Sequence, residues 1–156
     1  QFYGAINHVA PSYIRVEADE ATYNLHILLR FELERALVKG DLKPADVPGE
    51  WNSRFEKYFG VKVDNDANGC LQDIHWSAGL IGYFPTYTLG NLHSAQFFNQ
   101  ARKELTDLDE QLETGNLLPL REWLREKMQQ KVSGQSLSHK PLVDYMNKKY
   151  GDIYGF

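Results

Sequence analysis

The feature that most constrains this chain is a helical pattern of apolar residues that runs from about Ser12 to Lys39. Ser12 can cap the start of such a helix, and Gly40, after the basic Lys39, can end it. At about 1.5 Å per residue the helix would span about 40 Å. We therefore expect a mainly α-helical chain built around one long helix. The apolar residues recur at steps of three and four, which is typical of one helix face; they include Ile14, Ala18, Ala21, Leu25, Leu28 and Leu29.

The rest of the chain carries shorter helical patterns and little strand signal. Only Val61–Val63 alternates as a strand would. Residues 69–90 hold four glycines and several aromatic residues but no Lys, Arg or Glu. This composition is typical of a pocket wall more than of a solvated loop, although a buried structural loop is the alternative. We expect the other helices at about residues 50–59, 88–113, 117–128 and 140–149, followed by a tail at 150–156.

Composition narrows the class of protein. Seventeen Lys and Arg against twenty-one Asp and Glu give a net charge of −4, which argues against nucleic-acid binding and against a polybasic membrane patch. No stretch approaches the roughly 18 apolar residues of a membrane span. The single cysteine, Cys70, excludes an intrachain disulfide framework and favours a reducing compartment, so we expect the cytoplasm. The opening phrase QFYGAINHVAPSY reads like the middle of a longer sequence, and we expect a fragment.

A polar stripe follows the start of the expected long helix. Arg15, Asp19, Tyr23 and His26 fall at steps of four, four and three residues, so they would share one face. The stripe is either a solvated face with an ordinary ion pair or the lining of a cleft. In a cleft, Arg15 would offer a fork of donors to a carboxylate. Asp19 would fix the guanidinium there, and Tyr23 would supply a hydroxyl.

Hydrogen-bonding side chains are concentrated after the glycine turn at residue 69. Gln72, Asp73 and His75 lie within four residues, and Tyr83 and Tyr87 follow in the same uncharged stretch. A carboxyl group beside a histidine can fix its tautomer and favour its charged form. This segment is therefore the second candidate for a functional site.

No metal site is recognisable from the spacing of ligand residues. The five histidines include no pair spaced as His-Glu-x-x-His, and no compact His, Cys and carboxylate cluster occurs. Residues 64–69 resemble the start of a calcium loop, but the glutamate expected at the twelfth position is missing. We expect no metal ligand in this chain.

Two of these segments together resemble one protein family. Ile14–Asp19 (IRVEAD) and Gly69–Trp76 (GCLQDIHW) look like the IRxxAD and GxxQDxHW motifs of the carboxypeptidase Taq family of thermostable-type metallocarboxypeptidases. Residues 17–37, 82–90 and 149–155 also resemble the C-terminal third of that family. The resemblance implies that residues 1–156 are the C-terminal portion of a single catalytic domain of a gluzincin-like helical metallopeptidase, which hydrolyses C-terminal residues from peptide substrates.

The same resemblance implies a zinc cofactor whose ligands lie elsewhere. In this family two histidines of an HExxH helix and a downstream glutamate hold the zinc, and those residues, like the HPF and DxRxT motifs, are absent here. The chain would then need the missing N-terminal part of the same protein and would be inactive alone. The sequence segment between Met128 and Gly134 also looks shorter than is usual in the family.

The resemblance further implies roles for the polar residues. His75, with Tyr83 or Tyr87, would stabilise the oxyanion of the tetrahedral intermediate, and Arg15 would bind the C-terminal carboxylate of the substrate. Gln72 and Asp73 would orient His75 or the peptide backbone, with Asp19 and Tyr23 in support. The intact protein would be a homodimer. The alternative is a non-catalytic helical interaction module derived from such an enzyme.

Overall fold

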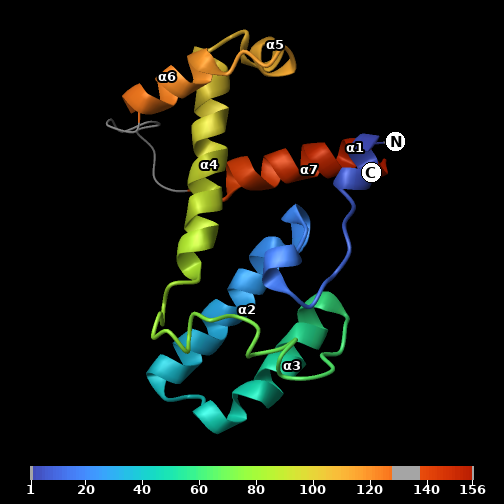
Figure 1. Ribbon diagram of the computed structural model, residues 1–156, viewed down its shortest axis with the longest axis vertical. Coiled ribbons are helices and arrows are strands. Elements are labelled where there is room, and N and C mark those ends of the chain that lie inside the picture. Colours follow the sequence, from blue (N-terminus) through green and yellow to red (C-terminus); the bar gives the residue numbers. More distant parts are fainter. Residues whose placement is uncertain (1, 128–137, 156) are drawn as a thin grey trace. The chain divides into compact units, whose positions relative to one another are not determined.

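The computed structural model describes residues 2–127 and 138–155, and no β-strand occurs within these ranges. The expectation of a mainly α-helical fold is therefore confirmed. The segment from Met128 to Gly134, which looks short for the family, lies outside the described residues. Among the helices described, none combines the length and the hydropathy that a membrane span requires. The helices, shown in Figure 1, are α1 (Phe2–Ile6), the 3-10 helix η1 (Arg15–Glu17), α2 (Glu20–Lys39), the 3-10 helix η2 (Pro44–Asp46), α3 (Val47–Phe59), α4 (Pro85–Glu104), α5 (Leu108–Glu113), α6 (Leu118–Lys127) and α7 (Lys140–Tyr154).

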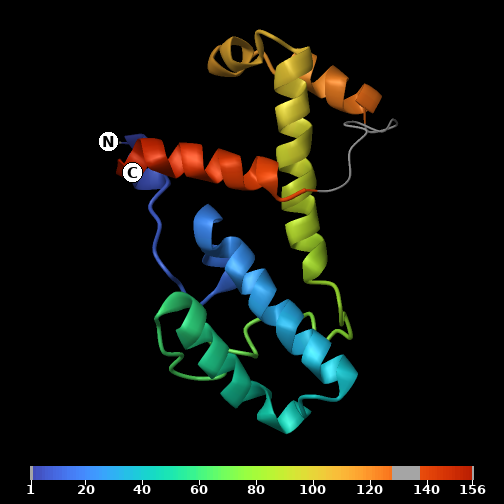
Figure 2. The same ribbon diagram turned by 180° about the vertical axis from the view of Figure 1, so that it is seen from behind.

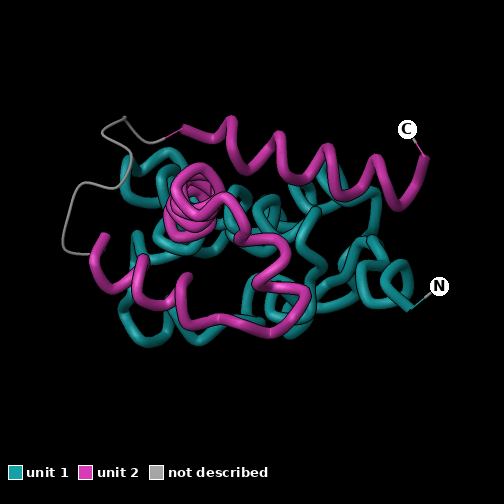
Figure 3. Tube along the Cα trace, turned by 90° about the horizontal axis from the view of Figure 1, so that it is seen from above, with its two compact units in different colours: residues 1–88 teal, residues 89–156 magenta. Residues whose placement is uncertain are grey.

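The chain forms two compact units, residues 1–88 and residues 89–156 (Figure 3). The first unit holds α2 and α3, together with the irregular segment that follows α3. Helix α4 begins in the first unit and continues into the second, which also holds α5, α6 and α7. Both motifs quoted above, residues 14–19 and 69–76, lie in the first unit.

Helix α2 begins later than its apolar pattern predicts. Asp19 and not Ser12 is the N-cap: its backbone is extended, and its Oδ1 accepts a hydrogen bond from the Thr22 backbone N–H at 2.9 Å. The backbone of Ile14 and of Ala18 is also extended, on either side of the short 3-10 turn at η1. The prediction of one helix from Ser12 was therefore wrong, and Arg15 does not share a helix face with Tyr23 and His26. The C-terminal end is confirmed, since Gly40 closes α2 at a φ of +80°.

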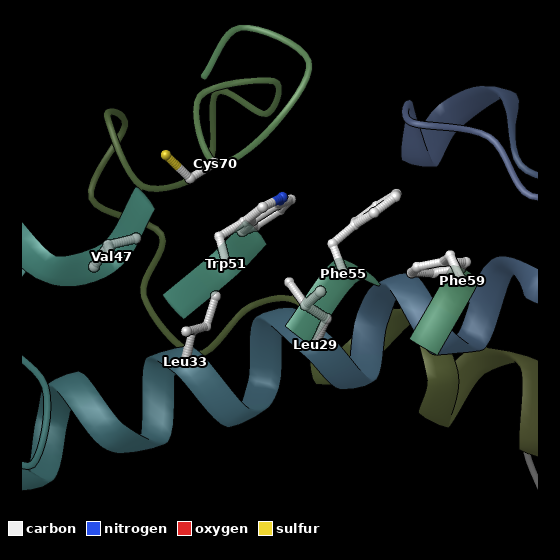
Figure 4. Close-up of a cluster of buried hydrophobic side chains, with 7 residues drawn as sticks. All are labelled: Leu29, Leu33, Val47, Trp51, Phe55, Phe59 and Cys70. Atoms are coloured by element: carbon white, nitrogen blue, oxygen red, sulfur yellow. The ribbon is translucent and has the colours of Figure 1, made fainter. Parts of the chain in front are cut away.

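The core of the first unit lies where α2 packs against α3. The two helices run side by side in both ribbon views (Figures 1 and 2). Helix α3 starts three residues before the predicted Glu50, with Pro48 in its first turn, where a missing N–H has no cost. Figure 4 shows the buried side chains gathered at this contact: Leu29 and Leu33 from α2, Val47, Trp51, Phe55 and Phe59 from α3, and Cys70 from the segment beyond α3.

In the second unit, two further helix boundaries differ from those predicted from the sequence. The pattern at 88–113 forms two helices, because α4 ends at Glu104 and α5 starts at Leu108. This break allows Leu108 to fold back into a small cluster with Ala101 of α4 and Trp123 of α6. The expected tail is also helical, since α7 continues to Tyr154 and ends at Gly155, whose φ is +76°.

Candidate functional site

Asp73 lies between two arginines. Its Oδ1 accepts hydrogen bonds from Arg15 Nε at 3.0 Å and Nη2 at 2.7 Å, and its Oδ2 accepts from Arg30 Nε at 2.7 Å. Arg30 Nη2 is also 2.6 Å from Oδ2. Each guanidinium group thus brings Nε and Nη2 to a single carboxylate oxygen, Oδ1 for Arg15 and Oδ2 for Arg30, and contacts between such charged groups are strong. We call Arg15, Arg30 and Asp73 the charge cluster.

The charge cluster is almost removed from water. The side chains of Arg15, Arg30 and Asp73 are 7%, 1% and 11% exposed. Burial opposes the ionised form of Asp73, but the hydrogen bonds and charges of both arginines outweigh it and lower the pKa of its carboxyl. Burial lowers the pKa of Arg30 to about 10, and the nearby charge of Arg15 acts in the same direction. Two guanidinium groups therefore share one carboxylate within the charge cluster.

Arg15 is held by aromatic groups as well as by Asp73. Its Nη1 donates to the Tyr23 hydroxyl at 3.0 Å, and its guanidinium carbon lies 5.0 Å from the centre of the Tyr87 ring. Burial lowers the pKa of Arg15, but the hydrogen bonds to Asp73 and Tyr23 more than compensate, so that the net shift is upward. Arg15 is therefore charged and fixed in direction.

Gln72 joins the two motif segments through the backbone. Its Oε1 accepts from the Arg15 backbone N–H at 2.8 Å, and its Nε2 donates to the carbonyls of Tyr13 and Asn68, each at 2.9 Å. A single amide side chain thus links residues 13–15 to the turn at residues 68–69. Gln72 supports Arg15 from the main chain, whereas Asp73 binds its side chain.

His75 lies in an aromatic pocket beside the charge cluster. Its Nε2 and the Tyr87 hydroxyl are 2.9 Å apart, and its ring centre is 4.3 Å from that of the buried Phe84. The Tyr83 ring lies 5.7 Å from the His75 ring and is 44% exposed. His75 Nδ1 is 3.9 Å from Asp73 Oδ1, which is too long for a hydrogen bond. In this geometry Tyr87, and not Asp73, is the hydrogen-bond partner of the imidazole.

Most of the site residues expected from the sequence are brought together. Arg15, Tyr23, Gln72, Asp73, His75, Tyr83 and Tyr87 form one continuous set of contacts in the first unit. Asp19 stands apart from the guanidinium that it was expected to fix. Its Oδ2 accepts from the Thr22 hydroxyl and the Ala10 backbone N–H, so it caps α2, the helix that carries Tyr23. Asp73 takes the place expected for Asp19.

Three residues of this site were missed by the sequence reasoning. Arg30 supplies the second guanidinium, Glu34 accepts hydrogen bonds from the loop, and the Phe84 ring lies beneath both arginines at 5.7 and 5.2 Å. Arg30 and Glu34 follow His26 at steps of four residues, immediately beside the apolar Leu29 and Leu33. Such positions are equally typical of the solvated edge of an amphipathic helix, so the spacing alone did not indicate that these two residues are buried.

The residues present do not fit a resident zinc ion. Within ranges 2–127 and 138–155, no group of three or more His, Cys, Asp or Glu side chains is placed to hold a metal ion. Asp73 is already saturated by two arginines, and the second buried histidine, His26, packs against Phe59 at 4.4 Å between ring centres.

Comparison with known proteins gives consistent matches. Residues 1–150 match the family described as Carboxypeptidase Taq (M32) metallopeptidase. "Thermostable carboxypeptidase 1" of Thermus thermophilus is 45% identical over 99% of this chain, and "Carboxypeptidase 1" of Bacillus subtilis is 39% identical over 98%. The crystal structure of the M32 carboxypeptidase from Deinococcus radiodurans superposes with a TM-score of 0.93 at 38% identity, covering 97% of this chain and 33% of that one.

The matches cover nearly all of this chain but only a part of each relative. Nearly all of this chain is aligned, but it covers only 32% of the Thermus protein and 33% of the Bacillus protein. The chain thus spans about a third of the length of the curated relatives that it matches. Because the family match extends over residues 1–150, this chain belongs to the carboxypeptidase Taq (M32) metallopeptidase family.

Proposed function

We propose that this chain is the C-terminal part of a metallocarboxypeptidase that removes C-terminal residues from peptides. Its relatives carry the name carboxypeptidase, and it spans about a third of their length. One observation carries the proposal: Arg15 of the first motif and Asp73 and His75 of the second belong to a single contact network with Tyr87. The residues that resemble the family motifs thus meet in one place.

The two guanidinium groups of the charge cluster support a role in carboxylate binding. A carboxypeptidase must recognise the free C-terminal carboxylate of its substrate, and two arginines that share one carboxylate favour a further anion nearby. Arg15 is the residue that we assign to this contact, since a guanidinium can bind a carboxylate through two parallel hydrogen bonds. Tyr23 and Gln72 hold Arg15 from two sides. Asp19 supports Tyr23 by capping α2.

His75, Tyr83 and Tyr87 are the residues that we assign to the oxyanion. The imidazole and the Tyr87 hydroxyl lie 2.9 Å apart, so that one of them could exchange this bond for a substrate oxygen. The more exposed Tyr83 adds a second phenol, its ring 5.4 Å from that of Tyr87. Donors fixed before the reaction stabilise a developing oxyanion without the cost of reorganisation.

Further properties of the intact protein are part of the same proposal. We infer a zinc ion from the family, with its ligands supplied by residues that this chain does not contain, and a homodimeric, cytoplasmic protein. The chain has a single cysteine, Cys70, and therefore no intrachain disulfide, which fits a reducing compartment. The peptide substrates and the N-terminal portion of the same protein are the partners that we propose.

The proposed function is tested by joining the chain to the upstream part of its reading frame and assaying release of C-terminal amino acids from peptides. We expect hydrolysis by the joined protein, loss of hydrolysis with a chelator and recovery with zinc. The 156-residue chain alone should be inactive. If the joined, folded protein releases no amino acid with zinc present, the non-catalytic helical module becomes the better description.

A further inference from the structure

Glu34 is a buried carboxyl group in the middle of α2. It is 3% exposed, and its Oε1 accepts two hydrogen bonds, from Trp76 Nε1 at 2.9 Å and from the Gly82 backbone N–H at 3.0 Å. Its Oε2 is buried without a hydrogen-bond partner among the described residues. Burying a carboxyl oxygen in this way is unfavourable. The two bonds at Oε1 must therefore matter to the local structure.

The two donors bracket one turn of the chain. Trp76 directly follows His75, and Gly82 directly precedes Tyr83. One carboxyl oxygen thus ties both ends of residues 76–82 to α2. The turn needs such an anchor because it has no regular secondary structure, and Gly82 adopts a φ of +82°. The Trp76 indole is placed further by edge contacts with Trp51 and Phe84, each 6.1 Å between ring centres.

We propose that Glu34 is the positioning residue that sets where His75 and Tyr83 lie. Its hydrogen bonds in the described part of the chain go to Trp76 and Gly82, and it acts through these two residues. The inference rests on the proposed function in one respect: it takes His75 and Tyr83 as the residues that face the substrate. The charge cluster is held separately, by Asp73, so Glu34 and Asp73 fix two different parts of the site.

A matched control is available on the same helix. Glu32 lies two residues before Glu34 on another face of α2, where it accepts hydrogen bonds from Arg54 and Tyr58 of α3. Glu32→Ala also removes a carboxylate with two partners, but none of these partners belongs to residues 69–84. If Glu34 only stabilised the fold, its removal would change the His75 signals no more than the removal of Glu32 does.

The test is NMR spectroscopy of the ¹⁵N-labelled 156-residue chain and its variants. Three indole N–H signals are expected, because the chain has three tryptophans. In Glu34→Ala, we expect the Trp76 indole signal to shift and its hydrogen exchange to accelerate by roughly tenfold. The chemical shifts of the His75 ring nitrogens should also change, because the hydrogen bond between Nε2 and the Tyr87 hydroxyl is lost. Glu34→Gln, whose amide oxygen can still accept both bonds, should restore both signals.

The Trp123 indole provides an internal reference, since it donates to Glu104 in the second unit and should not change. Should Glu34→Ala fail to fold, Trp76→Phe removes one donor while keeping an aromatic ring and should still perturb His75. The proposal is overturned if the His75 signals are unchanged in a folded Glu34→Ala or Trp76→Phe variant, or if Glu32→Ala changes them equally. An absence of hydrolysis in the joined protein would contradict the proposed function but leave this result intact.

Discussion

Helix α2 presents Leu29 and Leu33 to α3, and on a neighbouring face it presents Arg30 and Glu34 to the segment at residues 69–84. The first contact is apolar and depends on burial of side chains. The second depends on hydrogen bonds to charged groups that are nearly as well buried. The difference shows that one face of a helix can stabilise the fold while the neighbouring face positions the residues of a site.

Truncation on the apolar face should give the largest effect. Phe55 is fully buried between α2 and the residues around it. Phe55→Ala should lower the free energy of unfolding of the first unit by about 3–5 kcal/mol, because it removes packing and leaves a cavity. Urea denaturation followed by circular dichroism measures this loss. Val38→Ala, at a position that is 75% exposed, is the control and should change stability by less than about 0.5 kcal/mol.

Breaking the charge cluster should give the next largest effect. Asp73→Asn removes the negative charge between Arg15 and Arg30 and leaves two buried guanidinium groups facing each other. We expect a loss of about 3 kcal/mol, toward the lower end for a broken buried pair because Asp73 keeps some contact with water. The same urea titration applies. A loss below about 1 kcal/mol would mean that solvent screens the cluster, as it does surface pairs.

His26 should make stability depend on pH. Burial first, and then the charges of Arg30 and Arg15, lower its pKa to about 4 from the usual 6.5, although Asp73 and Asp19 act in the opposite direction. Below pH 6.5 His26 binds a proton in the unfolded chain, whereas in the folded chain it stays neutral until about pH 4. Stability should therefore fall across this window, by about 2 kcal/mol at pH 5 relative to pH 7.

His26→Leu tests this dependence. Neither ring nitrogen of His26 has a hydrogen-bond partner among the described residues, so an apolar replacement removes no such bond. The variant should show a flatter stability curve between pH 5 and 7, whereas His93→Gln, at an exposed position in the second unit, should keep the slope. The carboxyl of Asp73 does not interfere, since its pKa is lowered from 3.8 and its own contribution is lost only below this window. If stability still falls as steeply between pH 7 and pH 5 in His26→Leu, a group other than His26 causes the acid sensitivity.

The helix cap should give the smallest effect. Asp19→Ala removes the carboxyl group that accepts a hydrogen bond from the Thr22 backbone N–H in the first turn of α2 and should cost about 1 kcal/mol. Ser12→Ala, at the cap that the apolar pattern predicts, should cost less than about 0.5 kcal/mol. Equal losses in thermal or urea unfolding would contradict the observed start of α2.

The two faces of α2 also differ in how far the sequence predicts them. Periodicity identified only part of the apolar face: Leu29 is buried in the core and Leu25 packs against it, but Leu28, which the predicted pattern includes, is 41% exposed. It placed the start of the helix wrongly because Ile14 and Ala18 continue the spacing by chance, although their backbone is extended.

The polar face was only half predictable. Gln72, Asp73 and His75 were recognised from their local density, and the structure places them with Arg15 and Tyr87. Their partners on α2 were not recognised, because the hydrogen bonds that Arg30 donates to Asp73 and that Trp76 donates to Glu34 join residues more than forty positions apart. Pairing over such separations depends on how the segment at 69–84 folds against α2, which local patterns do not encode.

The most direct test of the account is the substrate preference of the protein joined to its upstream region. For peptides with a free C-terminal carboxylate and for their amidated forms, kcat/KM is measured with Arg15→Ala and with the control Arg54→Ala, whose arginine pairs with Glu32 and Glu50 on the opposite side of α2 and α3. We predict that Arg15→Ala alone reduces the preference for the free carboxylate by at least about tenfold. Equal losses on both peptides would contradict the assignment of the polar face to the substrate and leave Arg15 a purely structural residue.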